Sequence, residues 1–229
     1  MPGVIINVLS IVFGSWVGLL CKKGIPDKLS ASVMRILGLF VLSVGIVGVF
    51  KGENLLVLPV SLVLGTIVGE LLDIDAAIVR LGTSIERKTN FSGGFTQGFV
   101  TGTLLFCVGA MSVVGAIKAG TAGDHSILYA KAALDGIESI MLSATMGIGI
   151  MVSSMCVLIV EGGIALLSGI IAPVLTDAMI AEMTCVGSIL IMAVGFNLME
   201  VTKFKAANSL PAILFAPFLS LLFQHLGIG

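Results

Sequence analysis

The sequence predicts an all-α integral membrane protein, a polytopic transmembrane helix bundle of about eight spans forming one domain over residues 1–229. Two observations lead to this class. Of the 229 residues 57% are apolar and only 11% are charged, against about 25% charged in a soluble domain. Glycine occurs 29 times, as is common where membrane helices pack closely. The low charge excludes a cytosolic enzyme, and a net charge of −1 excludes a nucleic-acid binder.

Eight apolar stretches approach the roughly 20 residues that a helix needs to cross a bilayer core about 30 Å thick. Their expected bounds are 3–21, 32–50, 55–72, 96–118, 128–151, 155–175, 184–201 and 208–225. Only Ser153 and Ser154 separate the fifth and sixth stretches, so a seven-span count stays open.

The basic residues favour eight spans with an external N-terminus. Nine of the 12 then fall in or beside cytoplasmic loops, as the positive-inside rule requires: Lys22, Lys23, Lys28, Arg35, Arg80, Arg87, Lys88, Lys203 and Lys205. A seven-span order would place Lys203 and Lys205 outside. Both termini are therefore predicted to be non-cytoplasmic.

The long loop after the third stretch has its own pattern. Ile74, Ile78, Leu81 and Ile85 recur at helical spacing, with charged residues on the other faces. We expect an amphipathic interfacial helix over 74–90, acting as a connector or as a regulatory gate.

Weak internal repetition is visible near both ends of the chain. Residues 44–46 (VGI) resemble 194–196 (VGF), and 58–60 (LPV) resemble 210–212 (LPA). Spans seven and eight then match spans two and three in the opposite orientation. This pattern makes spans 1–3 and 6–8 a candidate inverted repeat, a feature of many transporters.

Charged residues at membrane depth are the main candidates for function, because each is costly unless paired or solvated. Lys131, Asp135 and Glu138 follow at helical spacing on one face of the fifth span. Two interpretations remain open. These groups respond to protons or cations along a transport path, or they lie in the outer headgroup region.

Four further polar residues are secondary candidates for the path. His125 is a candidate because histidine is the side-chain type that changes charge near physiological pH. Asp124 beside it could equally serve a turn or a helix cap. The side chains of Asn7 and Asn197 could form hydrogen bonds to neighbouring helices or could bind a solute. Glu161 precedes two glycines that could break its helix.

Glycine pairs at GxxxG spacing predict close helix packing, either within one protomer or between protomers of a homo-oligomer. The pairs are Gly14/Gly18, Gly65/Gly69 and Gly98/Gly102, and Gly109 could break the fourth span.

Patterns of catalysis are missing. The sequence contains no GxSxG, HExxH or Walker-type motif. The four cysteines, Cys21, Cys107, Cys156 and Cys185, form no CxxC pair. We therefore expect no enzyme activity, no metal site and no cofactor.

The strings GFVTGTLLFCVGAMSVVGAIKAG (98–120) and GDHSILYAKAALDGIESI (123–140) resemble the YdfK/YqgA-like bacterial inner-membrane proteins, a family of unknown function. The segments INVLSIVFGSWVGLL (6–20), LVLGTIVGELLDID (62–75) and KAANSLPAILFAP (205–217) fit the same family. The resemblance implies a multi-pass protein of the bacterial plasma membrane that acts as a transporter, and it supplies no substrate.

We therefore predict a secondary transporter or channel-like carrier for a small solute or ion, with spans four and five lining the path. Its expected partners are the lipid bilayer, the solute and further copies of the chain. The alternative is a non-transporting scaffold or sensor that works through helix–helix interactions.

Overall fold

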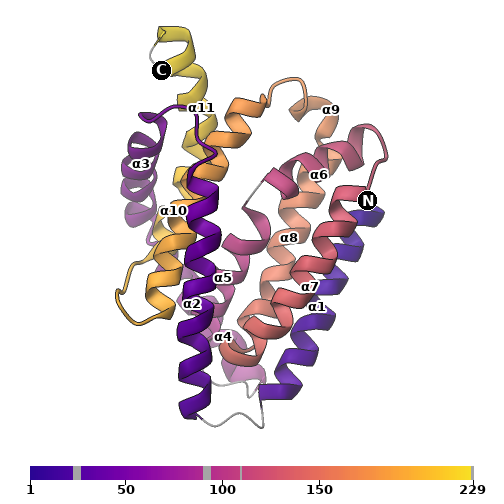
Figure 1. Ribbon diagram of the computed structural model, residues 1–229, viewed down its shortest axis with the longest axis vertical. Coiled ribbons are helices and arrows are strands. Elements are labelled where there is room, and N and C mark those ends of the chain that lie inside the picture. The colour runs from indigo at the N-terminus through magenta and orange to yellow at the C-terminus, as the bar shows by residue number, and fades with distance from the viewer. Residues whose placement is uncertain (23–26, 90–93, 109, 228–229) are drawn as a thin grey trace. The chain divides into compact units, whose positions relative to one another are not determined.

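The computed structural model describes residues 1–22, 27–89, 94–108 and 110–227, and within these ranges helices joined by turns and loops make up the chain, without a strand (Figure 1). The predicted all-α class is confirmed. The helices are α1 (Pro2–Lys22), α2 (Asp27–Val49), α3 (Val57–Leu72), α4 (Ile74–Thr89), α5 (Phe95–Cys107), α6 (Ala110–Thr121), α7 (Ser126–Met146), α8 (Gly149–Leu166), α9 (Ser168–Ile171), α10 (Asp177–Leu198), the 3₁₀ helix η1 (Ala206–Ser209) and α11 (Pro211–Leu226).

Five of the described helices are long and apolar enough to cross a membrane, and up to seven spans result if each of two bent pairs counts as one. The bent pairs are α3 with the start of α4, at 48°, and α5 with α6, at 56°. Helix α7 is 21 residues long, but its three charged residues set it apart from these apolar helices. Counting α7 as an eighth span stays a prediction.

Two predicted span boundaries are wrong. The fifth and sixth spans are separated at Gly147, which has a φ of +82°, and not at Ser153 and Ser154. Both serines are buried inside α8, where each hydroxyl donates to a backbone carbonyl one turn back. A serine satisfied in this way does not interrupt a helix.

The seventh span starts earlier than predicted, at Asp177 instead of residue 184. Thr176 caps this helix, since its hydroxyl oxygen accepts a hydrogen bond from the Met179 amide at 3.3 Å.

The interfacial helix expected over 74–90 corresponds to α4. Gly109, predicted to break the fourth span, lies outside the described residues.

The chain divides into two compact units. Unit 1 comprises Met1–Met34 and Ile78–Val174. Its helices pack in parallel pairs: α1 runs beside α7, and α5 runs beside α8 (Figure 1). Small residues permit this approach. A Cβ on Gly18 would lie 3.0 Å from the Ser143 Cβ, and one on Gly98 would lie 3.2 Å from the Met146 Cβ.

Unit 2 comprises Arg35–Ala77 and Leu175–Gly229. Here α2 is antiparallel to α10, and α3 is antiparallel to α11. A Cβ on Gly65 would collide with the backbone of Ala212, and one on Gly69 with the backbone of Asn208. Together with the parallel pairs of unit 1, these are the helix directions that an eight-span order requires.

The contacts between α2 and α10 have an internal regularity. A Cβ on Gly45 would approach Ser188 and Met192, whereas one on Gly195 would approach Gly38 and Leu42. An offset of 150 residues relates the two sets of contacts and also separates 44–46 from 194–196. A pair of inverted helices makes such reciprocal contacts. The repeat over spans 1–3 and 6–8 is not confirmed and stays a prediction.

Candidate functional site

A buried polar cluster joins three helices of unit 1. We call Asn7 of α1, Lys131 and Asp135 of α7, and Glu161 of α8 the Lys131 cluster. All four residues are buried, and Asn7 and Glu161 are fully enclosed, with 0% exposure. The structure thus brings together four of the seven residues predicted for the transport path.

Lys131 is the centre of the cluster. Its ammonium group donates a hydrogen bond to Asp135 Oδ2, one helical turn away. The same nitrogen lies 3.6 Å from Glu161 Oε1, so one cation serves two carboxyl groups. Asn7 Nδ2 donates to both oxygens of Glu161, at 3.3 and 3.2 Å. The amide therefore orients the Glu161 side chain toward Lys131.

The cluster has more acidic groups than basic ones. Two carboxyl groups share one ammonium, so it carries an excess of one negative charge when all three groups are ionised. Unit 1 also holds buried polar atoms without a hydrogen-bond partner: Asn7 Oδ1, His125 Nδ1 and the hydroxyl oxygens of Ser15, Thr101, Thr103 and Ser143. Buried polar groups are normally paired, and the excess negative charge favours a proton or a cation as the further partner of the Lys131 cluster.

Glycines explain how α1 comes close enough to supply Asn7. A Cβ on Gly3 would lie 2.9 Å from the Leu128 Cβ, and a Cβ on Gly14 would collide with the Gly136 carbonyl of α7. Close backbone approach of this kind is what small residues permit in membrane helices. Helix α8 continues without a break through the glycines that follow Glu161, so the helix break considered for this position is wrong.

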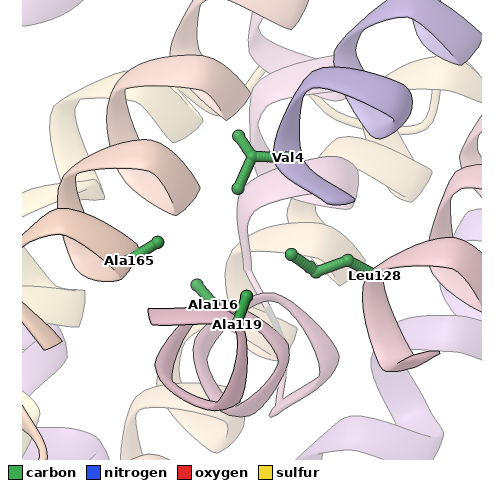
Figure 2. Packing of buried hydrophobic residues seen from close by; sticks show 5 residues of the cluster. All are labelled: Val4, Ala116, Ala119, Leu128 and Ala165. Carbon is green, nitrogen blue, oxygen red and sulfur yellow. The ribbon is translucent and has the colours of Figure 1, made fainter. Parts of the chain in front are cut away.

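An apolar cluster lies one helical turn from the Lys131 cluster along α1, α7 and α8, and α6 adds to it. Figure 2 shows its five buried side chains. Its buried side chains come from α1, α6, α7 and α8, and we call them the alanine plug: Val4, Ala116, Ala119, Leu128 and Ala165. Val4 is three residues before Asn7, Leu128 is three before Lys131, and Ala165 is four after Glu161. Residues at these spacings share a helix face, so the alanine plug packs beside the charged residues on the same helix faces.

The other predicted residues lie outside the Lys131 cluster. Glu138 is half-buried on the next turn of α7 and makes no hydrogen bond or ion pair within the described part of the chain. His125 precedes α7, with its ring 6.0 Å from that of Tyr129. Asn197 belongs to unit 2, where its side chain bonds to both the amide and the carbonyl of Phe204 and thereby holds a loop.

Asp124 has the turn role considered for it. Its Oδ1 accepts a hydrogen bond from the Ser126 amide at 3.0 Å, at the start of α7. This bond stabilises the carboxylate and lowers the pKa of Asp124 below its ordinary value.

Sequence reasoning missed Glu182. It is 1% exposed and lies near the start of α10 in unit 2. Because the seventh span was expected to begin at residue 184, this acidic residue was placed in a loop. Thr176, a residue type that often caps helices, is the sequence signal that would have predicted the earlier start of α10.

Helices of the same chain pack against all three GxxxG pairs. Gly14 and Gly18 face α7, Gly98 and Gly102 face α8, and the third pair, in α3, faces η1 and α11.

Comparison with known proteins agrees with the helical membrane architecture. The chain is 30% identical over 232 residues to the "Uncharacterized membrane protein YdfK" of Bacillus subtilis (strain 168), covering 100% of this chain and 99% of the relative. It is 31% identical over 220 residues to the "Uncharacterized protein YqgA" of Escherichia coli (strain K12), covering 93% and 94%. No solved structure matches it. A family model described as "Protein of unknown function (DUF554)" matches residues 2–221, and the chain therefore belongs to this family of membrane proteins.

Proposed function

We propose that the protein is a secondary transporter or channel-like carrier for a cation or proton across the bacterial plasma membrane, with the Lys131 cluster as its ion-responsive centre. The observation that carries the proposal is the sharing of one ammonium by two buried carboxyl groups. Ionisable groups in membrane helices are costly, and they mark ion or substrate pathways.

The cluster supplies a simple exchange. When a proton or cation binds at Glu161 or Asp135, the ammonium of Lys131 keeps the other carboxyl group as its partner. Release of the cation restores the shared arrangement. The cluster carries no net charge while a proton or a monovalent cation is bound, and one negative charge after its release, when both carboxylates share Lys131. Neither carboxylate is left in the low-dielectric interior without a cationic partner.

The alanine plug would control access from one side. In the predicted topology it lies toward the outer face, because the N-termini of α1 and α7 are external. Its side chains are mostly alanines, so a modest shift of α6 would open a route to the charges.

The alternative, a scaffold or sensor acting through partner helices, has less support. Its motivation was the GxxxG faces, and α7, α8 and α11 of the same chain cover them.

The test is proton flux in proteoliposomes that contain a trapped pH-sensitive dye, under an imposed pH gradient. We expect Asp135→Asn and Glu161→Gln to abolish most of the flux of the wild-type protein. Glu70→Gln is the matched control, because Glu70 is exposed on α3 in unit 2. Glu138→Gln separates the half-buried carboxyl group from the cluster itself.

Correct folding is checked by size-exclusion chromatography and circular dichroism of each variant. Full flux in folded Asp135→Asn and Glu161→Gln proteins would remove the cluster from the transport path.

A further inference from the structure

Unit 2 contains a pocket of about 350 Å³ that is independent of the Lys131 cluster. It lies where the loop after α2, the first turns of α10 and the end of α11 meet. Its polar lining includes Glu53, Glu182, Ser220 and Gln224, and its apolar lining includes Ala178 and Phe223.

Glu182 is the principal observation at this pocket. One carboxyl oxygen, Oε1, accepts hydrogen bonds from the backbone amides of Glu53 and Asn54, both at 2.7 Å. The other oxygen, Oε2, is buried and has no hydrogen-bond partner. The side chain is thus fixed by the loop, and its second oxygen, buried at the pocket, is left without a donor.

The charge of the pocket favours a positively charged ligand. Glu53 and Glu182 supply two carboxyl groups, and the described lining contains no lysine, arginine or histidine. A buried acceptor without a donor is costly. A positively charged donor would satisfy it best, since charge-assisted hydrogen bonds are the strongest ones.

The size and lining of the pocket distinguish an organic cation from a bare metal ion. Pockets for small organic ligands begin at roughly 300 Å³, and the space here is of that size. Its described lining offers two acidic side chains, and no group of three or more metal-binding side chains occurs among the described residues. Phe223 and Ala178 add an apolar wall, and an aromatic face attracts cations.

We propose that this pocket binds a small organic ammonium ion, a primary amine with a short apolar body. The ammonium group donates to Glu182 Oε2 and to the carboxylate of Glu53. Ser220 and Gln224 supply oxygen atoms for the remaining donor, because an ammonium has three N–H groups. The apolar body packs against Phe223.

The test measures binding of n-butylammonium to the full-length protein in detergent, by isothermal titration and by ligand-dependent thermal stabilisation. A ligand that prefers the folded state raises the apparent stability. We expect millimolar n-butylammonium to bind and to raise the unfolding temperature. Butan-1-ol, which has the same chain length and no charge, should not. This readout needs no transport, so its failure is distinguishable from failure of the proposed carrier function.

Two variants test the site. Glu182→Gln keeps an oxygen for the loop amides and removes the charge, and it should weaken n-butylammonium binding about tenfold or more. Glu53→Gln alters an exposed side chain, leaves its backbone amide in place and should also weaken binding. It remains informative if Glu182→Gln does not fold. Glu70→Gln, elsewhere on unit 2, should bind as the wild type does.

Several results would overturn the proposal. These are no binding of n-butylammonium to the wild type, equal stabilisation by butan-1-ol, or unchanged binding in both pocket variants. Binding of Ca²⁺ or Mg²⁺ that depends on Glu182, without binding of the ammonium, would assign the pocket to a metal ion instead.

Discussion

Replacement of Lys131 by methionine should destabilise the protein strongly. The methionine preserves the length and apolar character of the lysine stem and removes the ammonium group, with its charge and its hydrogen bond to Asp135. Asp135 and Glu161 then remain as two buried carboxyl groups without a cation. The lysine side chain is only 6% exposed, so water cannot replace the lost partner.

The magnitude follows from the geometry. At the 3.6 Å separation of Lys131 Nζ and Glu161 Oε1, the attraction is about 5 kcal/mol at an effective dielectric constant of about 20. The ion pair with Asp135 adds to it, and the desolvation of the lysine opposes it. Removing one partner of a buried ion pair costs about 3–5 kcal/mol, and we expect Lys131→Met to fall in this range.

The assay is reversible unfolding in mixed micelles, with helicity followed by circular dichroism. Lys118→Met is the matched control, because Lys118 is exposed in the last turn of α6, and its loss should cost less than about 1 kcal/mol. Combining Lys131→Met with Asp135→Asn removes one of the two orphaned charges and should recover part of the stability. A Lys131→Met protein as stable as the control, or a double variant with no recovery, would refute the assignment of the cluster as a coupled charge network.

Three further predictions use the same unfolding assay. Gly14→Leu forces a side chain into the α7 backbone and should lower the free energy of unfolding by about 1–3 kcal/mol. Gly163→Leu, whose side chain meets open space, should leave the stability nearly unchanged. Equal losses of stability in the two variants would contradict the packing of α1 against α7. Asn208→Ala removes the oxygen that accepts from the Asp75 amide at 2.7 Å and should cost about 0.5–2 kcal/mol, as other helix caps do. The lowered pKa of Asp124 means that its stabilisation is present above the ordinary value of 3.8 and is lost as the pH falls below it. Wild type and Asp124→Ala should therefore differ in stability at neutral pH and converge in acid, and a difference that persists in acid would contradict this role.

Some of the Lys131 cluster was predictable and some was not. Helical spacing alone placed Lys131 and Asp135 on one face of a helix, since residues four apart are neighbours. The same argument placed Glu138 with them, but it is only half-buried in the structure and does not join the cluster. Spacing shows which residues share a face, and it does not show where that face becomes buried.

Glu161 and Asn7 show the limit of sequence reasoning more clearly. They are 154 residues apart, and nothing in either local sequence indicates that they meet. Their contact depends on glycines that let α1 approach its neighbours. The same applies to Glu182, whose position inside a helix follows only from the start of α10 at Asp177, after the Thr176 cap.

The sequence by itself determined that the chain is a helical membrane protein and where most of its spans lie. The reason is that a bilayer imposes a fixed apolar length and requires each spanning backbone to satisfy its own hydrogen bonds. Tertiary structure alone decided which polar groups meet, that one lysine serves two carboxyl groups, and that a buried glutamate lines a pocket in unit 2. Such contacts join distant segments, and the packing of small residues between helices sets them, which no local pattern records.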